Sequence, residues 1–258
     1  MKIIRYKDPH SNEIKFGVIS GNKVCKLEGS PYDENLTINK KKSFELKFDN
    51  LLSPCNPNKI IALAINYLKL NEKKQSFHEP IIFLKTRNTI SKCNQKIKLF
   101  FDLPTWGESE LGLVIKRLTK NVTIKEANNH ILGYLPVNDV TCKNIENRDH
   151  HLARSKSADG YCPIGYYIDT EYNYNNKIIE SYHNNILLRR GNTNDMLWKP
   201  EKIISWLSKW MTLNAGDLII TGAPPRVKNR MYIKNGDIFT VKIEGFPKLE
   251  NTFYGSSR

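Results

Sequence analysis

The sequence lacks several features that mark large classes of protein. Among its 258 residues no apolar run approaches the roughly 20 residues needed to cross a bilayer. The first ten residues, MKIIRYKDPH, contain no long apolar stretch of the kind that a secretion signal requires. We therefore expect neither a membrane-spanning nor a secreted protein.

The sequence also has few cysteines and no nucleotide-binding motif. The five cysteines are odd in number, are widely spaced and form no Cys-x-x-Cys pair. This pattern favours neither a disulfide framework nor a zinc site, and it is typical of a reducing cytoplasm. No G-x-G-x-x-G or G-x-x-x-x-G-K-[ST] motif is present, so the sequence gives no support to a nucleotide cofactor.

Acidic residues are few relative to basic ones. The chain has 40 Lys+Arg against 26 Asp+Glu, a formal net charge of +14. The basic residues are spread along the whole chain, whereas a nucleic-acid-binding surface usually groups them with aromatic residues. We interpret the charge as a solvated surface, with attraction of anionic substrates as the alternative. We expect neither nucleic acid nor a membrane as a partner.

The length predicts one large domain, or one domain with a small appendage. Alternating apolar residues predict short strands over 3–7, 13–20 and 23–27, followed by a polar, loop-like segment over 28–50. A proline-punctuated junction follows near residue 55. We therefore expect a small N-terminal β domain over residues 1–55 and a catalytic domain over 56–258.

Short strands dominate the rest of the chain. The clearest helix is expected over 200–211, where Pro200 suits the first helical position and Glu201 suits the positive end of the helix dipole. Helical spacing predicts that Trp206 and Trp210 lie in the core. The pattern indicates an α+β protein, β-dominated with peripheral helices, and not a doubly wound sheet. Strands are expected over 59–65, 81–85, 111–115, 131–140, 186–190, 218–221, 238–244 and 249–253.

Three carboxylates are candidates for a metal site. Glu108 and Glu110 lie two residues apart at the start of an expected strand, so their side chains share one face. The opposite face carries Leu111 and the apolar residues that follow it at every second position, and we expect it to be core. Two adjacent carboxylates repel each other unless a cation lies between them. Asp139, at the end of another expected strand, would complete an oxygen-only set suited to Mg²⁺ or Mn²⁺.

Each candidate also has a simpler interpretation. Paired glutamates are common on exposed strands, and an Asn-Asp pair is common in turns. Lys156 lies between small residues in Ser155-Lys156-Ser157-Ala158, unlike a lysine on a highly charged face. Taken alone, that segment is more typical of a solvated loop lysine than of a catalytic one.

Five segments follow one another along the chain in a distinctive order. They are Glu108-x-Glu110, Gly133-Tyr134…Asn138-Asp139, Lys156-Ser157-x-Asp159…Cys162-Pro163-x-Gly165, Gly191-Asn192-Thr193-x-Asp195-Met196 and Thr221-Gly222-x-Pro224. This order resembles the fumarylacetoacetate hydrolase family. The resemblance covers residues 57–255 and implies a mixed β-roll, usually dimeric, that acts on 2-oxo acids, acylpyruvates and related dioates. It implies Glu108, Glu110 and Asp139 as ligands of Mg²⁺ or Mn²⁺ and Lys156 as the catalytic lysine.

The chain departs from the family pattern around the expected site. Leu70 and Lys73 stand where hydrolytic members place a water-activating His and Glu. Arg189 replaces a usual Gln, Ala223 replaces a usual Thr, and Arg226 stands where a Gly is usual. A leucine cannot accept a proton and a charged lysine cannot orient a histidine, so these changes count against efficient hydrolysis.

We therefore expect a cytoplasmic, divalent-metal-dependent homodimer that acts on small 2-oxo acids or dioates by enolate chemistry, either isomerisation or decarboxylation. One alternative is a C–C bond hydrolase of an acylpyruvate or fumarylacetoacetate-like substrate with a relocated base, for which His78 and His151 are the first candidates. The pair His150 and His151 is otherwise expected in a surface loop. The other alternative is a catalytically weak relative that serves as a binding or structural dimer.

Overall fold

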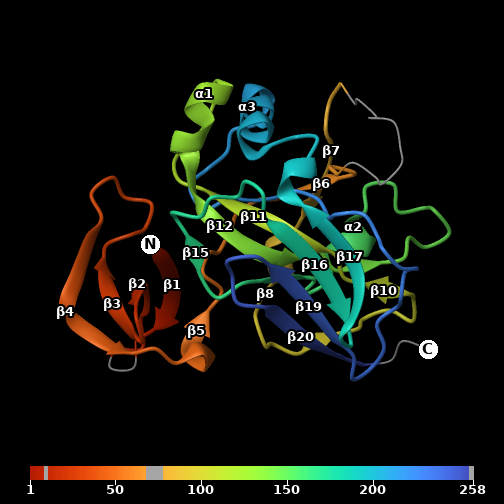
Figure 1. Ribbon diagram of the computed structural model, residues 1–258, viewed down its shortest axis with the longest axis horizontal. Coiled ribbons are helices and arrows are strands. Elements are labelled where there is room, and N and C mark those ends of the chain that lie inside the picture. The colour runs from red at the N-terminus through yellow and green to blue at the C-terminus, as the bar shows by residue number, and fades with distance from the viewer. Residues whose placement is uncertain (9–10, 68–77, 256–258) are drawn as a thin grey trace.

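The computed structural model describes residues 1–8, 11–67 and 78–255. Strands dominate, as the sequence predicts. Within the described residues they form a thirteen-stranded sheet, a five-stranded sheet and a two-stranded ladder. The helices α1 (Ile124–Ala127) and α3 (Pro200–Trp210) lie together on one side of the molecule (Figure 1). No helix in the described part of the chain has the length and apolar character to cross a membrane.

The elements follow in chain order. The large sheet contains β1 (Lys2–Lys7), β2 (Ile14–Ser20), β3 (Lys23–Glu28), β4 (Thr37–Glu45), β5 (Leu51–Leu52), β6 (Ile60–Ala64), β7 (Ile81–Lys85), β8 (Ile90–Lys92), β11 (Ser109–Ile115), β12 (Ile131–Asn138), β14 (Cys162–Ile164), β15 (Ile168–Asp169) and β18 (Leu218–Ile220). The five-stranded sheet contains β9 (Ile97–Lys98), β16 (Ile178–His183), β17 (Ile186–Asn192), β19 (Ile238–Ile243) and β20 (Leu249–Tyr254). The ladder pairs β10 (Thr105–Trp106) with β13 (Thr141–Cys142), and a short helix, α2 (Ala153–Lys156), follows β13. Single 3₁₀ turns are η1 (Phe48–Asn50), η2 (Arg87–Thr89), η3 (Asn128–His130) and η4 (Thr193–Asp195).

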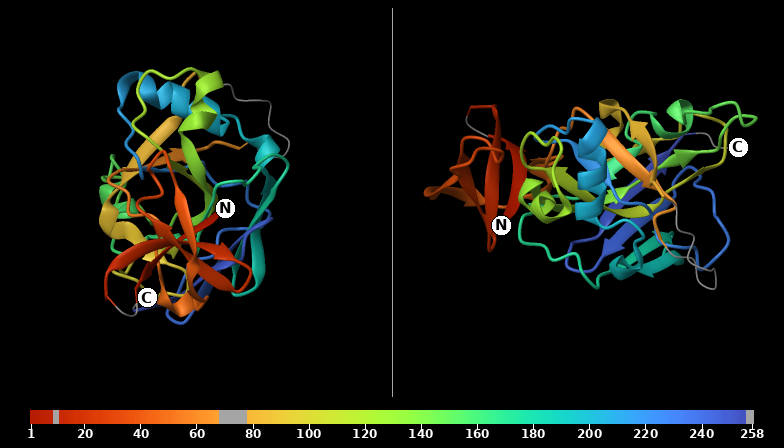
Figure 2. Two further views of the ribbon diagram at one scale, coloured as in Figure 1. Left: turned by 90° about the vertical axis from the view of Figure 1, so that its left-hand side faces the viewer. Right: turned by 90° about the horizontal axis from the view of Figure 1, so that it is seen from above.

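The N-terminal strands β1 to β4 form a lobe at one end of the long axis (Figures 1 and 2). They join the large sheet where β1 pairs with β15, with Ile3 opposite Ile168. The expectation of a loop over 28–50 was wrong for β4, a mostly polar strand that pairs with β3 on both sides of a bulge. Backbone hydrogen bonds hold such an edge strand without an apolar side-chain pattern. The division near residue 55 stays a prediction.

The strand β11 lies between β12 and β18 and is buried on both faces. Leu111 and Leu113 belong to the larger apolar cluster, as expected, which also includes residues of α3 and the five-stranded sheet. Val114, on the opposite face, belongs to a second cluster. A Cβ on Gly112 would lie 2.6 Å from the Val137 side chain, so a larger residue would force the two strands apart. The strand that carries Glu110 and follows directly after Glu108 is therefore buried along its whole length.

The predicted helix is confirmed as α3, with Pro200 in its first turn. Ile203 and Leu207 are fully buried, and Trp206 packs partly buried against the larger cluster. The expectation that Trp210 lies in the core was wrong, because its side chain is 51% exposed in the last turn. There it meets the edge of the Trp206 ring at a centroid distance of 5.3 Å.

Candidate active site

The register between β11 and β12 brings the three expected carboxylates together. Ser109 lies opposite Asn138, so Glu108 and Asp139 flank the same end of the paired strands. The amide of Asp139 donates to the carbonyl of Glu108 at 2.9 Å, and the amide of Glu108 donates to Oδ1 of Asn138 at 3.1 Å. One carboxylate oxygen from each of Glu108, Glu110 and Asp139 lies within 4.8 Å of the other two.

The donor chemistry of this group fits a divalent cation. Glu110 is only 2% exposed and accepts one hydrogen bond, from the amide of Gly222 at 2.5 Å. Burial, and then the charges of Asp139 and Glu108, raise the pKa of Glu110 well above its usual value. A bound cation would remove this repulsion, and an all-oxygen set is what hard divalent ions prefer.

Two buried lysines hold Asp139 from the other side. Lys85 donates to Asp139 at 2.7 Å, and Lys156 donates to its second oxygen and to Oγ1 of Thr141 at 2.7 Å. Burial would raise the pKa of Asp139, but Lys156 and then Lys85 outweigh it and keep that pKa below its usual value. Each carboxylate oxygen has two acceptor positions, so Asp139 can accept from a lysine and still bind a cation.

Lys156 is 6% exposed, so its interpretation as a solvated loop lysine was wrong. It ends α2, which begins after Leu152 in a left-handed conformation, and its ammonium lies 4.5 Å from the centre of the Phe83 ring. Burial alone would lower the pKa of Lys156, but Asp139 and then Glu108 raise it above its usual value. The side chain therefore carries a positive charge at neutral pH.

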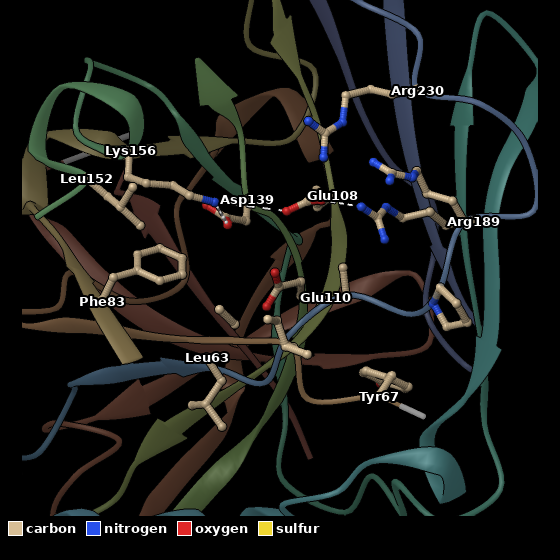
Figure 3. Close-up of a pocket in the computed structure, with 15 residues that line it drawn as sticks. Leu63, Tyr67, Phe83, Glu108, Glu110, Asp139, Leu152, Lys156, Arg189 and Arg230 are labelled. Carbon is tan, nitrogen blue, oxygen red and sulfur yellow. Dashed lines mark hydrogen bonds and ion pairs between the residues drawn. The ribbon is translucent and has the colours of Figure 1, made fainter. Parts of the chain in front are cut away.

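These groups face one cavity of about 590 Å³. In Figure 3 the carboxylates lie in the middle of the view, with Lys156 on one side of Glu108 and the labelled arginines on the other. Apolar side chains supply much of the remaining wall. The lining consists of Leu63, Ala64, Ile65, Tyr67, Phe83, Glu108, Glu110, Asp139, Leu152, Lys156, Arg189, Ala223, Pro225, Arg226 and Arg230.

Three arginines line the side of the cavity opposite the lysine. Arg189 forms an ion pair with Glu108 and donates to the carbonyl of Pro224 at 2.6 Å. Arg226 and Arg230 come from the loop between β18 and β19. The guanidinium carbon of Arg230 lies 3.8 Å from the centre of the Trp106 ring.

The segment after β6 forms the lower wall in Figure 3, where Tyr67 is labelled. Asn66 holds this segment in place through two hydrogen bonds. Its side chain accepts from the amide of Trp198 at 2.8 Å and donates to the carbonyl of Thr221 at 2.7 Å. Ile65 has a φ of 55°, a strained value for a β-branched residue. The hydroxyl of Tyr67 is buried in this wall and has no hydrogen-bond partner in the described part of the protein.

The structure thus brings together all four residues that the sequence singled out. Sequence reasoning missed Lys85, whose signal was a lysine at the end of an apolar strand, and it assigned no role to Tyr67 or Arg230. Leu70 and Lys73 lie outside the described residues. The expectation that His150 and His151 lie in a surface loop is confirmed, since both are exposed, as is His78.

Comparison with known proteins agrees with the resemblance. The family model for the fumarylacetoacetate (FAA) hydrolase C-terminal domain matches residues 59–254, so the chain belongs to this family. Among solved structures, a 5-carboxymethyl-2-hydroxymuconate delta-isomerase from Mycobacterium smegmatis superposes with a TM-score of 0.88 at 29% identity, covering 98% of this chain and 99% of that one. The predicted β-dominated fold is therefore confirmed.

Curated relatives catalyse more than one reaction. A mitochondrial oxaloacetate tautomerase from Xenopus laevis is 32% identical over 216 residues, 78% of this chain and 67% of that protein. A 2,4-didehydro-3-deoxy-L-rhamnonate hydrolase from Sphingomonas sp. is 31% identical over 199 residues, 72% of this chain and 70% of that protein. The family consists of enzymes that include isomerases, tautomerases and hydrolases, and the reaction of this chain has to be argued from its own site.

Proposed function

We propose that this protein is a divalent-metal-dependent enzyme that interconverts the keto and enol forms of a small 2-oxo acid. The observation that carries the proposal is the set of Glu108, Glu110 and Asp139, the last two of them buried, which faces the same cavity as the charged Lys156. The second reaction that this site suits is loss of carbon dioxide from a carboxylate on carbon 3 of a 2-oxo acid, because the electron pair of the broken C–C bond then passes to the keto oxygen and gives the same stabilised enolate.

The three carboxylates would hold Mg²⁺ or Mn²⁺. When bound, the ion supplies Lewis-acid stabilisation of charge on the oxygens of a 2-oxo acid. The sheet holds Glu108 and Asp139 together through their backbone and Asn138 hydrogen bonds, so the donor set needs little reorganisation to bind.

Lys156 supplies the second positive charge at the site. Its ammonium is held by Asp139 and Thr141 and lines the cavity, where it can stabilise negative charge on a substrate oxygen. Because its pKa is raised, it acts as a cation and proton donor at neutral pH rather than as a general base. Phe83 and Leu152 beside it limit the access of water to this part of the cavity.

Hydrolysis would require a group that activates water. Among the described residues that line the cavity none is a histidine, and both candidates for a relocated base, His78 and His151, are exposed. This observation favours enolate chemistry over the hydrolase alternative. A protein that serves only as a binding or structural dimer would show no metal-dependent turnover. Measuring such turnover therefore distinguishes the enzyme from that alternative. Assembly as a homodimer remains part of the proposal, and light scattering tests it.

The decisive experiment follows the decay of enol absorbance for a panel of 2-oxo acids and acylpyruvates, with Mg²⁺, with Mn²⁺ and with a chelator. We expect metal-dependent acceleration of keto–enol exchange for at least one 2-oxo acid, and no rapid cleavage of acylpyruvates. Release of carbon dioxide in the same samples identifies a decarboxylase. Fast hydrolysis of an acylpyruvate, or no metal-dependent turnover of any panel member, would contradict the proposal.

A further inference from the structure

A second cleft, of about 670 Å³, lies apart from the catalytic cavity, and the two share no described lining residue. One part of its wall comes from β1 and β2 of the N-terminal lobe. The other part comes from β5, η2 and β8 and the segments beside them. The reaction proposed above uses none of these residues, so a ligand of this cleft would bind separately from the 2-oxo acid.

Three basic side chains meet in this cleft. Arg5 comes from β1, Arg87 begins η2, and Lys92 ends β8. None of the described residues that line the cleft is acidic. Within the described part of the chain, no carboxylate forms an ion pair with Arg5 or Arg87. The lining therefore presents three positive charges and no negative one, in a concave site that concentrates their field.

The two arginines act on each other. Arg5 is half-buried, and Arg87 is exposed at the cleft. Burial lowers the pKa of Arg5 below its usual value, and the positive charge of Arg87 acts in the same direction. An anion bound between the two guanidinium groups would replace this repulsion with attraction.

Both guanidinium groups keep donors for a ligand. A guanidinium has five N–H donors. Arg5 donates from Nη1 to the carbonyl of Ser53 at 3.4 Å, and Arg87 donates from Nε to Oδ1 of Asn56 at 2.8 Å. The second bond fixes the Arg87 side chain and leaves both of its Nη groups without a protein acceptor in the described residues. Such a planar fork of donors matches the oxygens of a phosphate group.

Apolar side chains from three strands complete much of the wall. One of them, on β2, is 54% exposed, and those on β5 and β8 are half-buried. These side chains could contact the organic part of a phosphate ester, and a cleft of this volume has room for a small one. They are Ile14, Leu52 and Ile90.

We propose that this cleft is a binding site for a phosphate group, carried by free phosphate or by the ester of a small organic molecule. The group would lie between Arg5 and Arg87, with Lys92 adding positive charge. A phosphate monoester has a charge of about −1.5 to −2 at neutral pH and three acceptor oxygens, so it balances three cations better than a single carboxylate does.

Calorimetric titration of the protein with inorganic phosphate, phenyl phosphate and phenol tests the site. We expect saturable binding of both phosphates and none of phenol, which lacks the anionic group. Tighter binding of phenyl phosphate than of inorganic phosphate identifies an ester as the preferred ligand, and the reverse order identifies free phosphate. Because no described lining residue of the cleft is acidic, the affinities should be the same with and without Mg²⁺.

Variants attribute the binding to the cleft. Arg87→Gln changes an exposed side chain and should weaken phosphate binding about 10- to 100-fold, the range typical of charge-assisted hydrogen bonds. Arg87→Lys keeps the charge but loses the planar fork, so it should weaken binding less. Adding Arg5→Gln to Arg87→Gln should remove the binding. If this double variant does not fold, Arg87→Gln alone decides the test.

Two controls remove equal charge elsewhere. Arg148→Gln changes a side chain that is 78% exposed and lines neither cavity, and Arg226→Gln changes the catalytic cavity. Both should keep the phosphate affinity. No saturable binding of either phosphate, or an unchanged affinity in Arg87→Gln, would overturn the proposal. An equal loss in Arg148→Gln would also overturn it, because the effect would then reflect net charge. A loss in Arg226→Gln alone, or binding only with Mg²⁺ present, would place the anion in the catalytic cavity and overturn it as well.

Discussion

The two sides of the cavity are built in different ways. On one side, Glu110 belongs to β11, and Glu108 and Asp139 flank the paired ends of β11 and β12. A backbone amide donates to Glu110, two lysines donate to Asp139, and Arg189 pairs with Glu108. On the other side, Arg226 and Arg230 come from an irregular loop, and no carboxylate in the described part of the chain pairs with either of them. Strands buried on both faces hold side chains in place, whereas loops tolerate sequence change.

This difference indicates a division of roles. The sheet side has the residues that the family resemblance implies, in a donor set that suits a cation. The loop side has Ala223 and Arg226, and Arg189 of β17 lines the cavity beside them; all three depart from the family pattern. We infer that the chemistry depends on the sheet side and that the choice of substrate depends on the loop side.

The largest effect is expected on the sheet side, at Glu110. Glu110→Gln keeps the acceptor for the Gly222 amide but removes a charge from the carboxylate set. With Mg²⁺ at about one hundred times its dissociation constant, the unaltered protein should gain about 2.7 kcal/mol of stability by mass action. The variant should gain almost none, and its turnover should fall to background. Thermal melting with and without Mg²⁺ measures the first effect.

A matched control for this prediction is Glu34→Gln. Glu34 is 86% exposed and contributes nothing to the cavity lining, so its loss should leave the Mg²⁺ shift intact. Equal Mg²⁺ shifts in the protein and in Glu110→Gln would exclude Glu110 as a ligand.

The next effect separates the two lysines that hold Asp139. Lys156 lines the cavity and Lys85 does not, although both donate to the same carboxylate. Lys156→Met should lower turnover by about 100-fold or more, because it removes positive charge at the reacting atoms. Removing one partner of a buried ion pair typically costs about 3–5 kcal/mol, so both variants should lose stability.

The comparison between these variants is therefore kinetic. Lys85→Met should show the loss of stability with a smaller fall in turnover than Lys156→Met, in rates measured well below both melting temperatures. Equal falls in turnover would mean that Lys156 acts only by positioning Asp139.

A smaller effect should come from Gly107, which precedes the first carboxylate. A Cβ at this position would lie 2.6 Å from Oδ1 of Asn138 and 2.7 Å from the Phe239 ring. Because that Oδ1 accepts from the Glu108 amide, Gly107→Ala should displace Glu108 and weaken Mg²⁺ binding. Overpacking of this kind costs typically about 1–3 kcal/mol. The Mg²⁺ affinity, measured by calorimetry, should fall in this variant. Gly21→Ala is the control, because Gly21 lies in a distant turn with open space around it, and its Mg²⁺ affinity should be unchanged.

The sheet side of the site could be predicted from the sequence because its signal is local. Glu108 and Glu110 are two residues apart on one strand, and Asp139 ends an apolar run that pairs with it. The arginine side could not be predicted, because the contact of Arg230 with Trp106 joins residues 124 positions apart in an irregular loop and a two-residue strand. The burial of Lys156 was equally hidden, since it results from packing against Phe83 and Asp139. Strand β4 escaped prediction because its residues are polar, and its pairing comes from the backbone.

The smallest effect is expected at the exposed histidines. It tests whether a catalytic base lies outside the two sides of the cavity described above. His151 lies in an exposed turn just before Leu152, which lines the cavity, so it is the histidine best placed to replace a missing base. General-base catalysis is typically worth about 10²–10⁴-fold, and its loss would be obvious. We expect His151→Gln and His78→Gln to change turnover of the 2-oxo acid by less than about twofold, because neither side chain lines the cavity. Steady-state rates across neutral pH provide the measurement. A fall of about 100-fold in either variant would place a base at that histidine, outside both the sheet side and the loop side, and would favour hydrolysis over keto–enol exchange.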